Sequence, residues 1–267
     1  MPESDQPLSC HVSDYVATIT LERPDALNAL NVAMLEELGR TLARYQSDTD
    51  VRAVVLTGTG RAFCAGGDLR DLSSYGARKG DGFRYGAGVF HQTVLAMRAL
   101  PKPIVAAIQG VAAGGGMSLA FACDLRVMAD STFMQVGYVG RGLSPDGGLS
   151  YFLPRLVSPA KALELALLDE RLGAAECLEL GLVNEVVPED QVAPRAQEMA
   201  HRLSRGPGMA MARAKMLMSG SGGLTLAEQL ERERLSIAEC ADSPEGDEGL
   251  RSFIEKRAPD FLSLAKK

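Results

Sequence analysis

The sequence predicts an α/β fold, because segments typical of buried strands alternate with segments typical of helices. Two of these strands, 51–57 and 104–108, are rich in Val, Ile and Ala, and each is followed by a glycine turn and then by helical sequence. Further strands are expected at 15–21, 125–129 and 183–187. Repeated units of a strand and a helix build sheets that are covered by helices.

The helices are distributed unevenly along the chain. They are expected at 31–47, with Asn31 as the N-cap, and at 82–100, 209–218 and 225–241. From about Glu198 the composition becomes helical and charged, and the cluster at 219–223 is rich in glycine and serine. We therefore expect a core of residues 1–197 and a C-terminal helical portion of residues 198–267.

The composition is that of a compact protein without a nucleic-acid or membrane partner. A chain of 267 residues is long enough for one large domain, with or without a small appendage. The net charge is −6, and the Lys and Arg residues are scattered, which argues against nucleic-acid binding. The most apolar stretch, 104–123, is interrupted by polar residues and glycines, so we interpret it as a buried strand and helix rather than a membrane span.

The cysteines and histidines indicate a reducing compartment and no metal. Five cysteines are widely spaced and form no C-x-x-C pair. The acidic start of the chain lacks the basic and apolar segments of a secretory signal, so we expect a cytoplasmic protein. The three histidines, His11, His91 and His201, are too far apart in the sequence for a metal motif, and we expect no bound metal.

The most informative motif is P-I-V-A-A-I-Q-G-V-A-A-G-G-G-M-S-L-A-F-A-C-D at 103–124, which joins a buried strand to an apolar helix through Gly114, Gly115 and Gly116. Such a turn lets the backbone approach a ligand, and the first N–H groups of the helix can bind negative charge. The motif fits neither a dinucleotide fingerprint, because Leu119 stands where Gly or Ala is needed, nor a phosphate loop. Close packing is an alternative explanation of the glycines.

A second glycine turn, R-A-F-C-A-G-G-D-L at 61–69, follows the strand at 51–57. Two strands therefore end in two glycine turns. Enolate and acyl-transfer chemistry commonly uses two backbone N–H donors that converge on one thioester oxygen. One donor from each turn would meet this need.

Four motifs in the same order resemble those of the enoyl-CoA hydratase/isomerase, or crotonase, family. They are R-P-D-A-L-N-A-L at 23–30, F-C-A-G-G-D-L at 63–69, P-K-P-I-V-A-A-I-Q-G-V-A-A-G-G-G at 101–116 and A-A-E-C-L-E-L-G-L-V-N-E-V-V at 174–187. The resemblance implies a crotonase-like spiral of ββα units. It also implies a C-terminal helical portion that covers active sites and builds homotrimers or dimers of trimers.

The same resemblance implies a site for an acyl-CoA substrate, whose CoA is part of the substrate rather than a separate cofactor. The oxyanion hole would be formed by the N–H groups of Ala65 and Gly115. The residues expected to bind the substrate or its CoA are Arg23, Ala26, Leu27, Gly66, Gly67, Asp68, Leu69 and Gly114. Lys256 matches a basic position that reaches the CoA of its own or a neighbouring subunit, although a solvated lysine at a helix end explains it as well. The segment 72–88 is expected to supply pocket walls.

The sequence departs from the hydratase pattern at the two positions that matter most for adding water. Hydratases of the family carry two glutamates that hold and activate a water molecule. The matching positions here are Ser118 and, by the spacing from Phe133, Gly137. Neither residue can act as a carboxylate base, so ordinary hydration is not expected.

Asp146 is the remaining candidate acid, in G-L-S-P-D-G-G-L-S-Y at 142–151. Pro145 and two following glycines place its carboxylate on a tight turn, where it could also serve as a plain helix cap. The segment resembles the branch of the family that holds the Δ3,Δ2-enoyl-CoA isomerases and the phenylacetate ring-epoxide isomerases, although Leu149 replaces the last glycine of that branch. In that branch an acid at this place shuttles a proton. A 4-chlorobenzoyl-CoA dehalogenase of the family has a nucleophilic aspartate here.

The sequence therefore predicts a CoA-thioester isomerase in which Asp146 moves a proton while Ala65 and Gly115 stabilise the enolate. Hydration or dehalogenation on the same scaffold is one alternative, and a CoA-ester-binding subunit without chemistry is another. We interpret His91 as an ordinary helix residue rather than a catalyst. Ser118 is expected to bond either to the substrate or to its own helix backbone.

Overall fold

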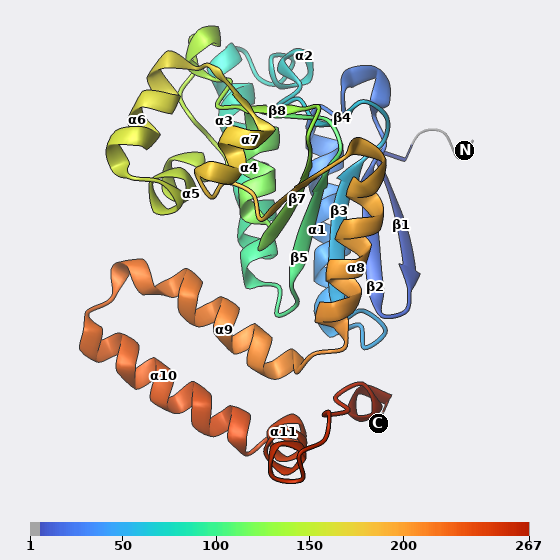
Figure 1. The fold of residues 1–267 in the computed structure, drawn as a ribbon. Helices are drawn as coiled ribbons and strands as arrows, with labels where there is room; N and C mark the ends of the chain where they lie inside the picture. The colour runs from blue at the N-terminus through green and yellow to red at the C-terminus, as the bar shows by residue number, and fades with distance from the viewer. Residues whose placement is uncertain (1–5, 267) are drawn as a thin grey trace.

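Residues 6–266 are described in the computed structural model, and a large mixed sheet runs through their centre (Figure 1). Its strand order is β1-β2-β3-β5-β7-β10, in which β1 and β2 are antiparallel and the other neighbours are parallel. The bounds of its strands are β1 Leu8–Ser13, β2 Val16–Leu21, β3 Ala53–Gly58, β5 Ile104–Ile108, β7 Leu125–Ala129 and β10 Glu185–Val187.

A second, smaller sheet has the order β4-β6-β8-β9. Its strands are β4 Ala62–Cys64, β6 Val111–Ala113, β8 Phe133–Gln135 and β9 Arg171–Gly173. The chain passes from β3 into β4, from β5 into β6 and from β7 into β8, and a helix follows each pair. This repetition is the spiral of ββα units that the sequence predicts.

The helices surround the two sheets and continue beyond them. Their bounds are α1 Val32–Ser47, α2 Leu69–Leu72, α3 Lys79–Ala99, α4 Gly115–Ala122, α5 Leu149–Leu156, α6 Pro159–Leu168, α7 Ala174–Glu179, α8 Val192–Ser204, α9 Gly208–Gly220, α10 Leu226–Ala241 and α11 Pro244–Ile254. Short 3-10 turns lie at Pro24–Ala26, Val139–Arg141, Glu189–Gln191, Ser221–Gly223 and Ser263–Lys266. None of the helices in residues 6–266 has both the length and the apolar character that a bilayer crossing requires.

The two faces of the large sheet are covered by different helices. Along β3, Val54 and Leu56 belong to the main apolar core, whereas Val55 belongs to a second cluster, because successive side chains of a strand point to opposite faces. Helix α8 packs into that second cluster through Ala196 and Ala200, which are fully buried. Alanines allow the helix to lie close to the sheet.

Two strands have the bounds that the sequence predicts, other elements differ by one to three residues, and the expected division of the chain falls inside a helix. The strands 104–108 and 125–129 agree residue for residue, and the side chain of Asn31 accepts the N–H of Met34, as an N-cap should. The expected division at residue 197 falls inside α8, which packs on the core sheet. The helices that extend away from the core begin with α9.

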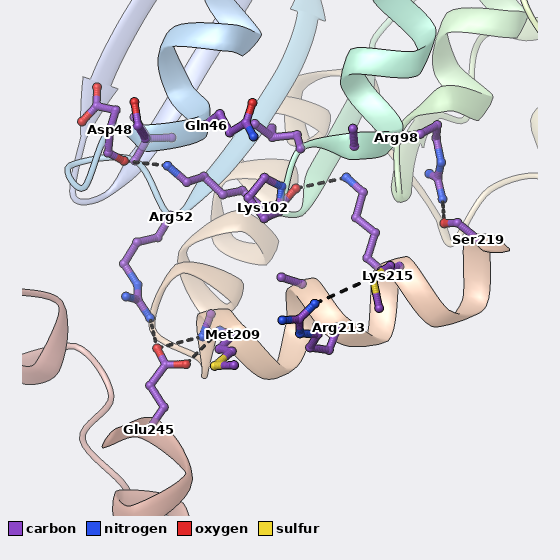
Figure 2. Close-up of a pocket in the computed structure, with 18 of the residues that line it drawn as sticks. Gln46, Asp48, Arg52, Arg98, Lys102, Met209, Arg213, Lys215, Ser219 and Glu245 are labelled. Carbon is purple, nitrogen blue, oxygen red and sulfur yellow. Dashed lines mark hydrogen bonds and ion pairs between the residues drawn. The ribbon is translucent and has the colours of Figure 1, made fainter. Parts of the chain in front are cut away.

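The helices α9, α10 and α11 form an arm that projects from the core (Figure 1). Its first helix is held by Lys215, whose ammonium lies 2.8 Å from the carboxylate of Asp124. The same ammonium donates to the carbonyl of Lys102 at 3.1 Å (Figure 2). An ion pair of 3.3 Å between Arg52 and Glu245 joins the core to α11. These contacts fix the base of the arm.

We expect Gly116 to be essential for the packing of α4 on β4, because a Cβ atom there would lie 2.0 Å from the carbonyl oxygen of Cys64. Gly116→Ala should lower the free energy of unfolding by about 3 kcal/mol, as overpacked cores do. The measurement is chemical denaturation at fixed protein concentration.

The matched control is Gly88→Ala, at an exposed position of α3 where an added Cβ would meet no atom within 4 Å. Helix propensity predicts that this change stabilises the protein by up to about 1 kcal/mol. If Gly116→Ala is as stable as Gly88→Ala, the close approach of α4 and β4 is contradicted.

Candidate active site

The two glycine turns lie against each other at the ends of neighbouring parallel strands, β4 and β6. Gly66 has a φ of +114°, and a Cβ atom there would lie 3.0 Å from the carbonyl oxygen of Ala113. A Cβ atom on Gly115 would lie 3.4 Å from the backbone nitrogen of Gly67. Glycine is needed at Gly66 because the conformation and the space both exclude a side chain.

Two backbone N–H groups are available where the turns meet. The N–H of Gly115 belongs to the first residue of α4, where no intrahelical acceptor exists. The N–H of Gly67 has no acceptor among the backbone bonds of the described residues. By contrast, the N–H of Ala65 donates to the carbonyl of Leu27 at 3.0 Å. The prediction that Ala65 supplies an oxyanion donor is therefore wrong, and the available pair is Gly67 and Gly115.

Asp146 lies on the loop before α5, and its main chain is held by two buried hydroxyl groups. Its carbonyl oxygen accepts from Ser118 Oγ at 2.8 Å and from the hydroxyl of Tyr138 at 3.2 Å. The two hydroxyl oxygens are 3.1 Å apart. Burial raises the pKa of Tyr138, so its phenol remains a hydrogen-bond donor at neutral pH. Ser118 thus positions the loop of Asp146.

The side chain that faces Ser118 belongs to Tyr138 and not to residue 137. Gly137 has a φ of +74°, and a Cβ atom there would lie 2.7 Å from the backbone nitrogen of Gly114. A glutamate could not be placed at that position without moving the glycine turn. The prediction that Gly137 stands at the position of the second hydratase glutamate stays a prediction, and the two groups that face each other here are the hydroxyls of Ser118 and Tyr138.

His91 is a site residue that sequence reasoning missed. Its Nε2 lies 2.5 Å from Oδ1 of Asp146, and 53% of the His91 side chain and 35% of the Asp146 side chain are exposed. The two residues are 55 positions apart, so no local motif connects them. The helical pattern of α3 places His91 beside the buried Phe90, but it contains no signal for the contact with Asp146.

A cavity of about 670 Å³ joins the two glycine turns to Asp146. Its wall includes both glycine turns, Phe90 and Asp146, and the 72–88 segment contributes Leu72 and Phe83, as predicted. Asp146 is the one acidic residue among the described residues that line it. A larger cavity of about 1060 Å³ lies between α9 and the core and contains none of the predicted site residues (Figure 2).

The segments expected to bind CoA are brought together by an ion pair. Arg23 Nη2 lies 2.8 Å from Oδ2 of Asp68, which also caps α2 by accepting the N–H groups of Arg70 and Asp71. Burial raises the pKa of Asp68, but the hydrogen bonds from Arg23 and from the helix N–H groups outweigh burial and hold the pKa below its usual range. The 3-10 turn that contains Ala26 and ends at Leu27 follows Arg23 directly, and Leu69 lines the cavity.

Lys256 is not brought to this site within one chain. It is an exposed residue just after α11, and it does not line the 670 Å³ cavity. In Figure 1 the arm lies at the end of the molecule opposite to α2. The prediction that Lys256 reaches the CoA of a neighbouring subunit stays a prediction.

Comparison with known proteins gives a consistent result over nearly the whole chain. A family model described as enoyl-CoA hydratase/isomerase matches residues 11–263. A probable enoyl-CoA hydratase of Rhodobacter capsulatus is 38% identical over 250 residues, which cover 94% of this chain and 95% of that protein. The 1,2-epoxyphenylacetyl-CoA isomerase of Escherichia coli is 34% identical over 252 residues, which cover 94% of this chain and 96% of that protein.

A solved structure gives the same picture. The crystal structure of an enoyl-CoA hydratase from a Polaromonas species superposes with a TM-score of 0.90 and 34% sequence identity. The match covers 95% of this chain and 98% of that one.

Proposed function

The chain belongs to the enoyl-CoA hydratase/isomerase family and has the crotonase fold, and we propose that within this family it is an enoyl-CoA isomerase that shifts a double bond by proton transfer through Asp146. The observation that carries this proposal is that Asp146 is the single acidic residue that residues 6–266 contribute to the cavity wall. One carboxylate can take and return a proton, whereas hydration needs further groups to hold and activate water.

The two available N–H groups support binding of the thioester carbonyl. The N–H groups of Gly67 and Gly115 would donate to its oxygen, and the positive end of the α4 dipole adds to their effect. These donors stabilise negative charge on the oxygen more than they stabilise the neutral carbonyl. They therefore favour the enolate that forms when a proton leaves the neighbouring carbon.

The proposed reaction has two steps. The carboxylate of Asp146 removes a proton from the carbon alpha to the thioester, and the electron pair moves onto the thioester oxygen. The enolate then collapses, the double bond shifts, and the protonated acid returns the proton two carbons further along the chain. No atom is gained or lost, and the acid ends in its starting state.

Hydration is the alternative that the names of most relatives favour, since several are named as enoyl-CoA hydratases. It is opposed by the hydroxyl pair of Ser118 and Tyr138, which is already bonded to the main chain of Asp146. Nucleophilic dehalogenation by Asp146 would release halide, and a CoA-ester-binding subunit would bind without turnover. Each alternative therefore gives a different result in a product assay.

The CoA portion and the assembly are proposed from the same resemblance. The contact between Arg23 and Asp68 supports a CoA site that also includes Ala26, Leu27 and Gly66.

We propose a homotrimer or a dimer of trimers, because the arm exposes large apolar side chains. Among them are Ile237 on α10 and Phe253 on α11, which are 72% and 84% exposed. The free cysteines support a location in the cytoplasm.

We expect Asp146→Asn to reduce isomerisation of a 3-enoyl-CoA by at least about 100-fold, since an amide cannot take the proton. Affinity for the acyl-CoA, measured by calorimetry, should change little because the N–H donors and the CoA contacts are unchanged. The assays are the gain of 2-enoyl-CoA absorbance for isomerisation and the loss of 2-enoyl-CoA absorbance for hydration.

The control is Asp190→Asn, an exposed aspartate in a 3-10 turn, which should keep wild-type turnover. Retention of most isomerase activity in Asp146→Asn would contradict the shuttle. Hydration that survives in the variant would instead favour a water-activating group elsewhere.

We expect the protein to sediment as a trimer or hexamer, and the double variant Ile237→Glu with Phe253→Glu to shift it toward smaller species, because charges on this face would oppose burial. Analytical ultracentrifugation measures the change. Val12→Glu, on an exposed position of β1, is the control. A wild-type monomer would contradict the proposed assembly.

A further inference from the structure

We propose that His91 is a positioning residue for Asp146, whose imidazole holds one carboxylate oxygen so that the other oxygen faces the thioester. The proposal rests on the isomerase function proposed above. It concerns a contact that joins α3 to the loop before α5, where Nε2 of His91 lies 2.5 Å from Oδ1 of Asp146.

The contact has a structural foundation on both sides. The buried ring of Phe90 packs so closely on the loop that a Cβ atom on Gly147 would lie 2.1 Å from Phe90 Cε1. Two successive residues of α3, Phe90 and His91, therefore meet two successive residues of the loop, Gly147 and Asp146. Because Phe90 is anchored in this way, the ring of His91, the next residue of the helix, is held in a fixed place.

The carboxylate of Asp146 needs such a partner because its other contacts involve only the main chain. Ser118 and Tyr138 hold its carbonyl oxygen, which fixes the loop but leaves the side-chain torsion free. His91 is the one hydrogen-bond partner of the carboxylate among the described residues. When Oδ1 is held, Oδ2 remains to take the proton and to return it.

The pair also lies between two cavities. His91 and Asp146 line a cavity of about 1040 Å³ on the side of α5, and Asp146 lines the 670 Å³ substrate cavity as well. The imidazole is half exposed, so it can exchange its own proton with solvent outside the substrate cavity.

The charged and titratable groups around this pair do not touch the carboxylate. Arg98 on α3 is paired with Asp124, and Arg155 on α5 lies over the ring of Tyr151. The other groups that line the two cavities are Arg126 on β7, Tyr138 and Arg141 near the 3-10 turn at 139–141, Lys79 and Arg84 on α3, and Cys123 after α4. All of them are unchanged in a His91 variant, so a change in kcat reports on His91 itself.

The experiment compares His91→Phe and His91→Gln with His11→Gln, a control on the exposed face of β1. His91→Phe removes the donor, and we expect kcat to fall about 10-fold or more while KM changes less than about 3-fold. His91→Gln can still donate an N–H from a similar distance, so kcat should recover to within about 3-fold of wild type.

An unchanged kcat in His91→Phe would overturn the proposal. Equal losses in His91→Phe and His91→Gln would also overturn it, because a positioning donor should be replaced by glutamine. Thermal denaturation of each variant identifies a loss that comes from misfolding.

A second measurement separates this proposal from the proposed function. The NMR signals of the His91 ring nitrogens should move in Asp146→Asn and stay in place in Asp190→Asn, because only the first variant changes the partner of the imidazole. Unchanged signals in Asp146→Asn would overturn the pairing whatever the enzyme catalyses. A wild-type protein without isomerase activity would overturn the proposed function and leave the NMR result standing.

Discussion

The close contact between the turn after β4 and the start of α4 is the constraint on which the other parts of the site depend. Because Gly66 and Gly116 have no side chains, the two segments can touch. This contact brings the N–H groups of Gly67 and Gly115 together. Because both turns follow paired strands of the small sheet, the ββα repeat itself places them side by side. The cavity, its apolar wall and the approach of Asp146 are all arranged around this point.

The residues behind the site support the proposal that one carboxylate carries the reaction. Ser118 lies on α4 just after the glycine turn, and Tyr138 faces it from the segment after β8. Their hydroxyl groups hold the main chain of Asp146 and so fix the loop of the acid. One fold can support different reactions, so the proposal rests on the groups at the site and not on the fold.

The sequence predicted the features that depend on local patterns. Both glycine turns, the N-cap of Asn31 and the strand at 104–108 follow from residue type and spacing, and the structure shows each of them. It did not predict which N–H groups are available, because the bond from Ala65 to Leu27 joins segments that only the folded chain brings together.

Two other features could not be predicted from the sequence. The contact of His91 with Asp146 depends on the relative placement of α3 and a distant loop. Spacing alone pointed to Gly137 as the partner of Ser118, and only the φ of Gly137 and the contact of Tyr138 with Ser118 show which side chain faces Ser118.

The most direct measurement of the central claim is mass spectrometry of the product formed from a 3-enoyl-CoA in water enriched in heavy oxygen. The account predicts a 2-enoyl-CoA of unchanged composition and without label, whereas a labelled hydroxyacyl-CoA as the main product would contradict it.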